Sequence, residues 1–134
     1  MKDARESGAR GARILLCEDE PIVAMDVQMT VEAEGYRVAG PYARLDRALE
    51  AMEGPSGEGI AAAILDVRLK DGDVFPLAEV LAARGIPLVF HSGHVLESDV
   101  CDRFPGARFC PKPVSPNCLL DALAAFSGAE EPAR

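Results

Sequence analysis

Short runs of apolar residues alternate along the chain with segments in which apolar residues recur every three or four positions. Short runs bounded by acids or turn residues are typical of strands buried on both faces of a parallel sheet. The wider spacing predicts amphipathic helices. The runs cover residues 14–17, 36–39, 60–65, 87–90 and 107–110, and the predicted helices cover 22–34, 45–52, 74–84 and 115–126. This alternation predicts an α/β fold with helices on both faces of a five-stranded parallel sheet.

Two of the helical segments need separate comment. The first carries an apolar stripe at Ile22, Met25, Met29 and Ala33, and we expect Met25 and Met29 to pack in the core. The other is a helix that the alternation requires between the fourth and fifth apolar runs, at about 93–104, in a stretch that holds Gly93, Pro105 and Gly106 and little apolar periodicity. We therefore expect a short or irregular helix there, at the low-stability end of the molecule.

The composition is that of one globular domain, expected over residues 13–127 with disordered tails over 1–12 and 128–134. Of the 134 residues, 49% are apolar, and the net charge of −8 disfavours binding to nucleic-acid phosphates. No apolar run approaches the roughly 20 residues that span a bilayer, and the N-terminus lacks the apolar segment of a secretory signal. We therefore expect a cytoplasmic protein with reduced thiols. The cysteines, which form no CxxC pair, are Cys17, Cys101, Cys110 and Cys118.

Polar side chains follow four of the apolar runs. In an open α/β sheet, ligands bind outside the carboxyl ends of the strands. The acids at 18–20 follow the first run, and Asp66, Ser92 and Lys112 follow the third, fourth and fifth. Clustered carboxylates suit a hard cation such as Mg²⁺, a lysine suits phosphate, and one carboxylate can act as a nucleophile that forms an aspartyl phosphate. The two histidines have no further ligands spaced nearby, so no histidine metal site is expected.

The same stretches carry a resemblance to a known family. They are ILLCEDEP (14–21), AAILDVRLKDGD (62–73), IPLVFHSGH (86–94) and RFCPKPV (108–114). Over residues 12–126 the chain resembles the receiver domains of two-component response regulators, and more specifically stand-alone receivers of the alphaproteobacterial type. The resemblance implies a flavodoxin-like, doubly wound (βα)5 fold with strand order 2-1-3-4-5.

The resemblance also implies roles for the acids. Asp66 resembles the phospho-acceptor, which also contacts Mg²⁺. Asp19 resembles the direct Mg²⁺ ligand, Glu18 a ligand that acts through water, and Arg68 a ligand that acts through its backbone carbonyl. A haloacid-dehalogenase-type phosphatase would need a second aspartate where Arg68 stands, which counts against that alternative.

The remaining implied roles belong to the residues that respond when Asp66 is phosphorylated, the switch residues. Ser92 resembles the hydroxyl that closes onto the phosphoryl group, Phe109 the switch aromatic, and Lys112 the partner of the phosphoryl oxygens. The Lys112–Pro113 bond is expected to be cis. Threonine is usual in the family where Ser92 stands, and serine keeps the hydroxyl. Tyrosine is frequent where Phe109 stands, and phenylalanine lacks the hydroxyl that could report phosphorylation to a partner. His94 falls where the family lines the entrance to the phosphoryl group.

The resemblance implies a single-domain response regulator that accepts a phosphoryl group on Asp66 from a sensor histidine kinase or phosphotransfer protein. The domain catalyses its own phosphoryl transfer and autodephosphorylation and is not otherwise an enzyme. Because only residues 128–134 follow the last predicted helix, we expect output through protein contacts, to a downstream regulator or a second copy, with no nucleic-acid or membrane partner. Two alternatives stay open: a phosphate sink that drains a kinase, and a phosphorylation-independent binding module.

Overall fold

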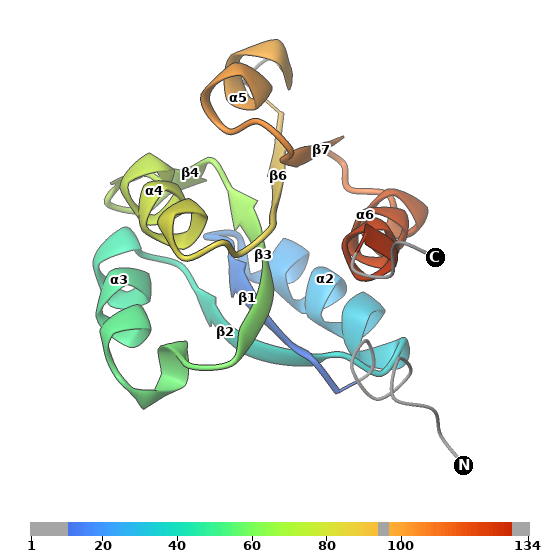
Figure 1. Cartoon of the computed structure of the whole chain (residues 1–134), viewed down its shortest axis with the longest axis horizontal. Coiled ribbons are helices and arrows are strands. Elements are labelled where there is room, and N and C mark those ends of the chain that lie inside the picture. The colour runs from blue at the N-terminus through green and yellow to red at the C-terminus, as the bar shows by residue number, and fades with distance from the viewer. Residues whose placement is uncertain (1–10, 94–96, 130–134) are drawn as a thin grey trace.

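The computed structural model describes residues 11–93 and 97–129 and contains the predicted five-stranded parallel sheet (Figure 1). Its strands are β1 (Arg13–Cys17), β2 (Arg37–Tyr42), β3 (Ile60–Asp66), β6 (Leu88–Ser92) and β7 (Arg108–Pro111). They pair in the order β2-β1-β3-β6-β7, which is 2-1-3-4-5 in chain order and confirms the prediction. A small antiparallel ribbon, β4 (Arg68–Leu69) with β5 (Gly72–Asp73), follows β3.

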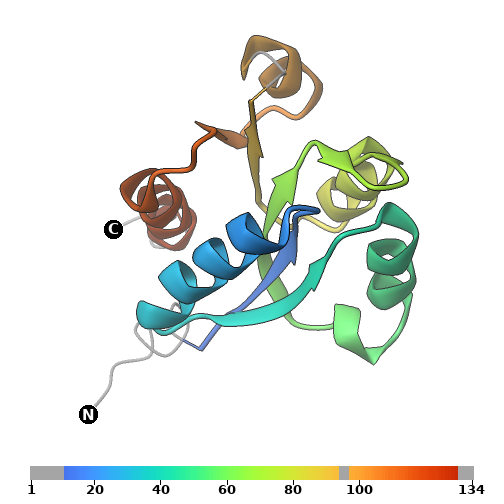
Figure 2. The same ribbon diagram turned by 180° about the vertical axis from the view of Figure 1, so that it is seen from behind.

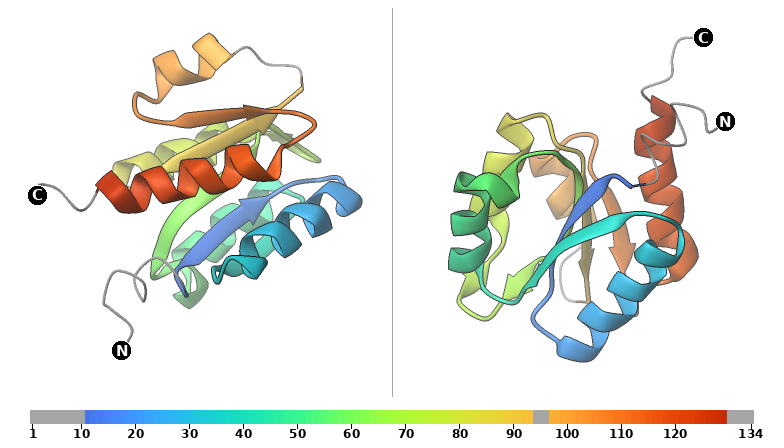
Figure 3. Two further views of the ribbon diagram at one scale, coloured as in Figure 1. Left: turned by 90° about the vertical axis from the view of Figure 1, so that its right-hand side faces the viewer. Right: turned by 90° about the horizontal axis from the view of Figure 1, so that it is seen from below.

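Helices cover both faces of this sheet, as a doubly wound fold requires. They are α2 (Pro21–Ala33), α3 (Leu45–Glu53), α4 (Phe75–Ala83), α5 (Glu97–Arg103) and α6 (Pro116–Ala129), with a 3-10 turn η1 (Pro55–Gly57) after α3. Helices α2 and α6 lie side by side on one face (Figures 2 and 3), and α3, α4 and α5 cover the other. Two apolar cores result, one on each face.

Alternation along the strands divides the buried residues between these cores. On β1, Ile14 and Leu16 point into the α2/α6 core, whereas Leu15 and Cys17 point into the opposite core. Strands β3 and β6 alternate in the same way, since successive side chains of a strand point to opposite faces. The same alternation determines the face of the sheet on which each residue just beyond a strand end lies.

The predicted core face of α2 is wrong. Ile22, Met25 and Met29 are 79%, 57% and 61% exposed, while the helix buries Ala24, Val27 and Val31. Both sets recur every three or four residues, so periodicity alone could not choose between them. The buried set has smaller side chains, which let the helix pack closely against the sheet.

Helix α5 is short, as predicted. It spans seven residues, Glu97–Arg103, and is held by Val100 and by Phe104 just beyond its end, both of which are buried. The Phe104 ring lies 5.4 Å from Phe90 and 6.0 Å from Phe75, measured between centroids. The prediction for His94 falls outside the described residues.

The predicted tails also fall mostly outside the described residues, although α6 continues to Ala129, two residues into the segment expected to be the C-terminal tail. The Lys112–Pro113 peptide bond is cis, as predicted, and so is Gly40–Pro41.

Within 11–93 and 97–129, no helix has the length and apolar character needed to cross a membrane.

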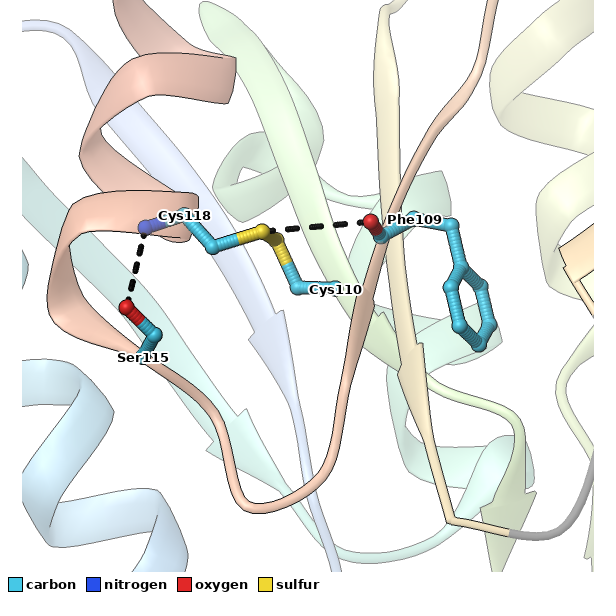
Figure 4. The surroundings of a disulfide bond; sticks show 4 residues. All are labelled: Phe109, Cys110, Ser115 and Cys118. Atoms are coloured by element: carbon cyan, nitrogen blue, oxygen red, sulfur yellow. Dashed lines mark hydrogen bonds between the residues drawn. A yellow bond between two sulfur atoms is a disulfide. The ribbon is translucent and has the colours of Figure 1, made fainter.

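The expectation of four reduced cysteines is wrong for one pair, because Cys110 and Cys118 form a disulfide (Figure 4). The chain leaves β7, turns, and re-enters at the first turn of α6, which brings the two Cα atoms to 6.0 Å. The Cys118 backbone N–H donates to the Ser115 hydroxyl at 3.3 Å and helps to hold this turn. Cys17 and Cys101 remain thiols.

Candidate functional site

Four polar side chains continue the α2/α6 face beyond its apolar core. Buried Leu16, Ile64 and Val89 are each followed two residues later by Glu18, Asp66 and His91. Lys112 follows Cys110 by the same interval. Asp66 and His91 are direct partners in the β3–β6 register, and His91 is the partner of Cys110 in β6–β7. The sheet therefore gathers these groups at its carboxyl edge, as the sequence predicts for Glu18, Asp66 and Lys112.

Lys112 links the carboxylates of this edge. Its Nζ lies 3.1 Å from Asp66 Oδ2, 3.3 Å from both oxygens of Glu18 and 3.4 Å from Glu20 Oε1. Glu18 and Asp66 are only 2% and 4% exposed, so their charges are screened little by water. Glu20 was part of the acidic run but had no predicted role. It is the residue directly before α2, at the same edge of the sheet.

Glu18, Asp19 and Asp66 together can hold a metal ion. One carboxylate oxygen from each lies within 4.8 Å of the others. All three ligands are oxygens, which favours a hard cation such as Mg²⁺. The backbone of Arg68, predicted to contribute a carbonyl, lies against this cluster, since the Arg68 N–H donates to Asp66 Oδ1 at 3.3 Å. The residues fit the predicted cation site.

The electrostatics of the site show an excess of negative charge. Burial raises the pKa of Glu18 to about 7, with a further increase from Asp66 and an opposing effect of the Glu20 backbone hydrogen bond. Burial also raises the pKa of Asp66, although the Lys112 hydrogen bond and charge oppose the shift. Burial tends to lower the pKa of Lys112, but Asp66 and Glu18 outweigh it and raise the pKa. One ammonium does not compensate three neighbouring carboxylates, so a divalent cation would be bound favourably.

Ser92 and Phe109 belong to the other face of the sheet. Ser92 ends β6 and is 3% exposed, and by alternation it follows Leu88 and Phe90 on the α3/α4/α5 face. Phe109 is half-buried, is the register partner of Phe90, and packs against the same core. The two predicted switch residues thus lie on adjacent strands and on one face of the sheet, opposite to the face that carries Asp66.

Sequence reasoning missed the part that His91 plays in this geometry. The imidazole is fully buried, and its Nε2 lies 3.5 Å from Glu18 Oε1. The signal was available in the alternation, because a strand residue two positions after Val89 must share its face. Burial lowers the pKa of His91 to about 3, with a contribution from the Lys112 charge, so the ring is neutral.

No protein-family model matches the sequence, and the curated proteins give no match either. Solved structures do match. The chain is similar to a response regulator receiver protein from Sinorhizobium medicae WSM419, with 26% identity, a TM-score of 0.79 and coverage of 90% of this chain and 98% of that chain. The solution structure of SdrG from Sphingomonas melonis Fr1 matches with 38% identity, a TM-score of 0.72 and coverage of 88% and 97%. The response regulator PhyR from Brucella abortus matches with 28% identity and a TM-score of 0.70, over 92% of this chain but 51% of PhyR.

Proposed function

The chain belongs to the response regulator receiver domains, and from this premise we propose that it accepts a phosphoryl group on Asp66 from a histidine kinase or phosphotransfer protein. One observation carries the proposal: a buried strand-end carboxylate lies 3.1 Å from a lysine ammonium and beside two further acids that can hold Mg²⁺. A phosphate sink shares this chemistry and differs only in having no output partner.

The chemistry follows from the groups around Asp66. A carboxylate oxygen of Asp66 forms a bond to phosphorus as the bond from phosphorus to the donor imidazole nitrogen breaks, and the imidazole leaves. Asp19, Glu18 and the Arg68 backbone carbonyl would hold Mg²⁺ together with Asp66, and the ion would supply positive charge that neutralises the phosphoryl oxygens. Lys112 already contacts Asp66, so its ammonium is within reach of an oxygen carried on that residue.

We propose that the donor protein docks on the exposed side of α2. Ile22, Met25 and Met29 form an apolar stripe there, which we call the α2 stripe. The helix begins directly after the acids of the site, so a histidine approaching Asp66 brings its own protein over this stripe. Apolar residues at this spacing fit the face of a second helix. The proposed occupant is therefore a helix of a histidine kinase or phosphotransfer protein.

We propose that output leaves by a different surface, formed by α5, β7 and α6. Ser92 and Phe109 lie on the strands that carry this surface, so a change in their packing reaches it directly. The proposed partner is a downstream regulator or a second copy of the chain. Separate donor and output surfaces would let one protein load the domain and another read it.

Replacing Ser92 by alanine is expected to separate acceptance from signalling. The hydroxyl acts only after the phosphoryl group has arrived, so Asp66 should still be labelled by a small phosphodonor. The conformational response should weaken, because the phosphoryl oxygen loses a hydrogen-bond donor. Hydrogen exchange of α5 and β7 with and without beryllofluoride, a phosphoryl mimic, measures that response. Ser92→Thr keeps the hydroxyl and serves as the control, and a wild-type response in Ser92→Ala would show that the assigned role is wrong.

Mg²⁺ is expected to stabilise the protein more at about pH 8 than at about pH 6. In the folded protein the pKa of Glu18 is raised from 4.5 to about 7. Protonation of Glu18 therefore stabilises the folded state fully below about pH 4.5, and this stabilisation is lost as the pH rises through about 7. Mg²⁺ competes with the bound protons and offsets the loss at high pH. Thermal unfolding with and without Mg²⁺ tests this, with Asp19→Asn as the control that lacks the increment. Equal increments at the two pH values would contradict it.

A further inference from the structure

His91 and Glu18 form a fully buried polar pair that the proposed chemistry does not use. The nearest approach, between His91 Nε2 and Glu18 Oε1, is 3.5 Å, and neither side chain is exposed. Within the part of the chain that the structure describes, neither imidazole nitrogen nor Glu18 Oε1 has an aligned hydrogen-bond partner. Leaving buried polar atoms without partners costs about 1–3 kcal/mol each, so an apolar residue would suit the core better. The imidazole therefore calls for an explanation other than packing.

The two oxygens of Glu18 differ in what surrounds them. Oε2 accepts hydrogen bonds from the Glu20 backbone N–H at 3.0 Å and from Lys112 at 3.3 Å. Oε1 lies 3.3 Å from Lys112 Nζ and faces the imidazole on its other side. Lys112 thus contributes to the position of both oxygens, while His91 lies beside one of them.

His91 is not itself part of the cation cluster. The oxygens that lie within 4.8 Å of one another come from Glu18, Asp19 and Asp66, and the imidazole lies behind Glu18. A group in this position acts on a metal site by orienting a ligand, and removal of such groups commonly weakens metal binding 10- to 100-fold.

We propose that His91 is a positioning residue: its Nε2, 3.5 Å from Glu18 Oε1, closes to a hydrogen bond with that oxygen when Lys112 moves away, and so orients the carboxylate toward the cation. The inference deepens the proposed function, on which it rests for the purpose of the cation. Once Lys112 turns to the phosphoryl oxygens, its contacts with Glu18 are given up. The imidazole, buried and fixed on β6, remains beside the carboxylate to hold it in place.

Direct cation binding tests this without any phosphodonor. The probe is Mn²⁺, whose free ion is counted by electron paramagnetic resonance while the full-length protein is titrated. His91→Leu removes both nitrogens but fills the space, and we expect it to weaken Mn²⁺ binding about tenfold. His91→Gln restores an N–H near the position of Nε2, and we expect affinity within about threefold of the wild type. Val89→Ala, a buried change on the same strand and face, controls for loss of stability and should leave Mn²⁺ binding unchanged.

Three outcomes would overturn the proposal: wild-type affinity in His91→Leu, no recovery in His91→Gln, or equal weakening in Val89→Ala. Thermal unfolding of each variant shows that the protein titrated is folded. Phosphoryl labelling of the wild type is measured separately. Failure of that labelling would overturn the proposed function, while the Mn²⁺ comparison would still decide the role of His91.

Discussion

Replacement of Asp66 by alanine is expected to abolish phosphoryl incorporation, by at least about a hundredfold, in a protein that remains folded. Among the carboxylates of the described residues that contact Lys112, Asp66 is the nearest, at 3.1 Å, and it ends β3 with 96% of its surface buried. Loss of one acid from a crowded cluster relieves repulsion, so folding should survive. Mass spectrometry after incubation with Mg²⁺ and a small phosphodonor measures the gain of one phosphoryl group.

Two controls make this result specific. Asp121→Asn changes an exposed acid on α6 and should leave labelling at the wild-type level. Asp19→Ala removes a cation ligand and should remove the dependence on Mg²⁺. Labelling of Asp66→Ala at the wild-type rate would refute Asp66 as the acceptor.

The second large effect concerns the α2 stripe. Met25→Asp places a charge in the middle of the proposed donor interface, and we expect transfer from a phosphorylated histidine kinase to fall about tenfold or more. Labelling by a small phosphodonor should stay unchanged, because Met25 is exposed to solvent and is not one of the site residues. The ratio of the two rates is therefore the measurement.

The matched control for this variant is Ala82→Asp, which introduces the same charge on an exposed position of α4, on the opposite face of the sheet. It should change neither rate. If Met25→Asp and the wild type receive phosphoryl groups from the kinase at equal rates, the donor surface lies elsewhere.

The strands and the residues that follow them could be predicted because both depend on local patterns. Once the apolar runs are placed, alternation dictates that Asp66 emerges on one face and Ser92 on the other. The packing of α2 could not be predicted in this way, since the helix has two apolar stripes and only the shape of the sheet beneath it selects one. His91 could not be assigned a role for a related reason: its strand is buried between β3 and β7, and its partner Glu18 is 73 positions away in the sequence (91 − 18).

The Cys110–Cys118 pair shows what sequence spacing leaves out. A separation of eight residues is compatible with many loop shapes, and it becomes a bond only because β7 and α6 are packed against the same core. Neither cysteine belongs to a short motif that would have suggested pairing.

The disulfide also changes the covalent topology of the protein at its functional edge. It closes a ring that contains Lys112, so in the oxidised molecule the lysine opposite Asp66 sits on a cyclic segment. By the chain-entropy model, a ring of this size removes about 2–3 kcal/mol of freedom from the unfolded chain. Cys118 is only partly buried, and both cysteines line a groove with Asp121. Protein prepared with and without a reductant is therefore two chemical species, which differ in whether the segment that carries Lys112 is closed into a ring.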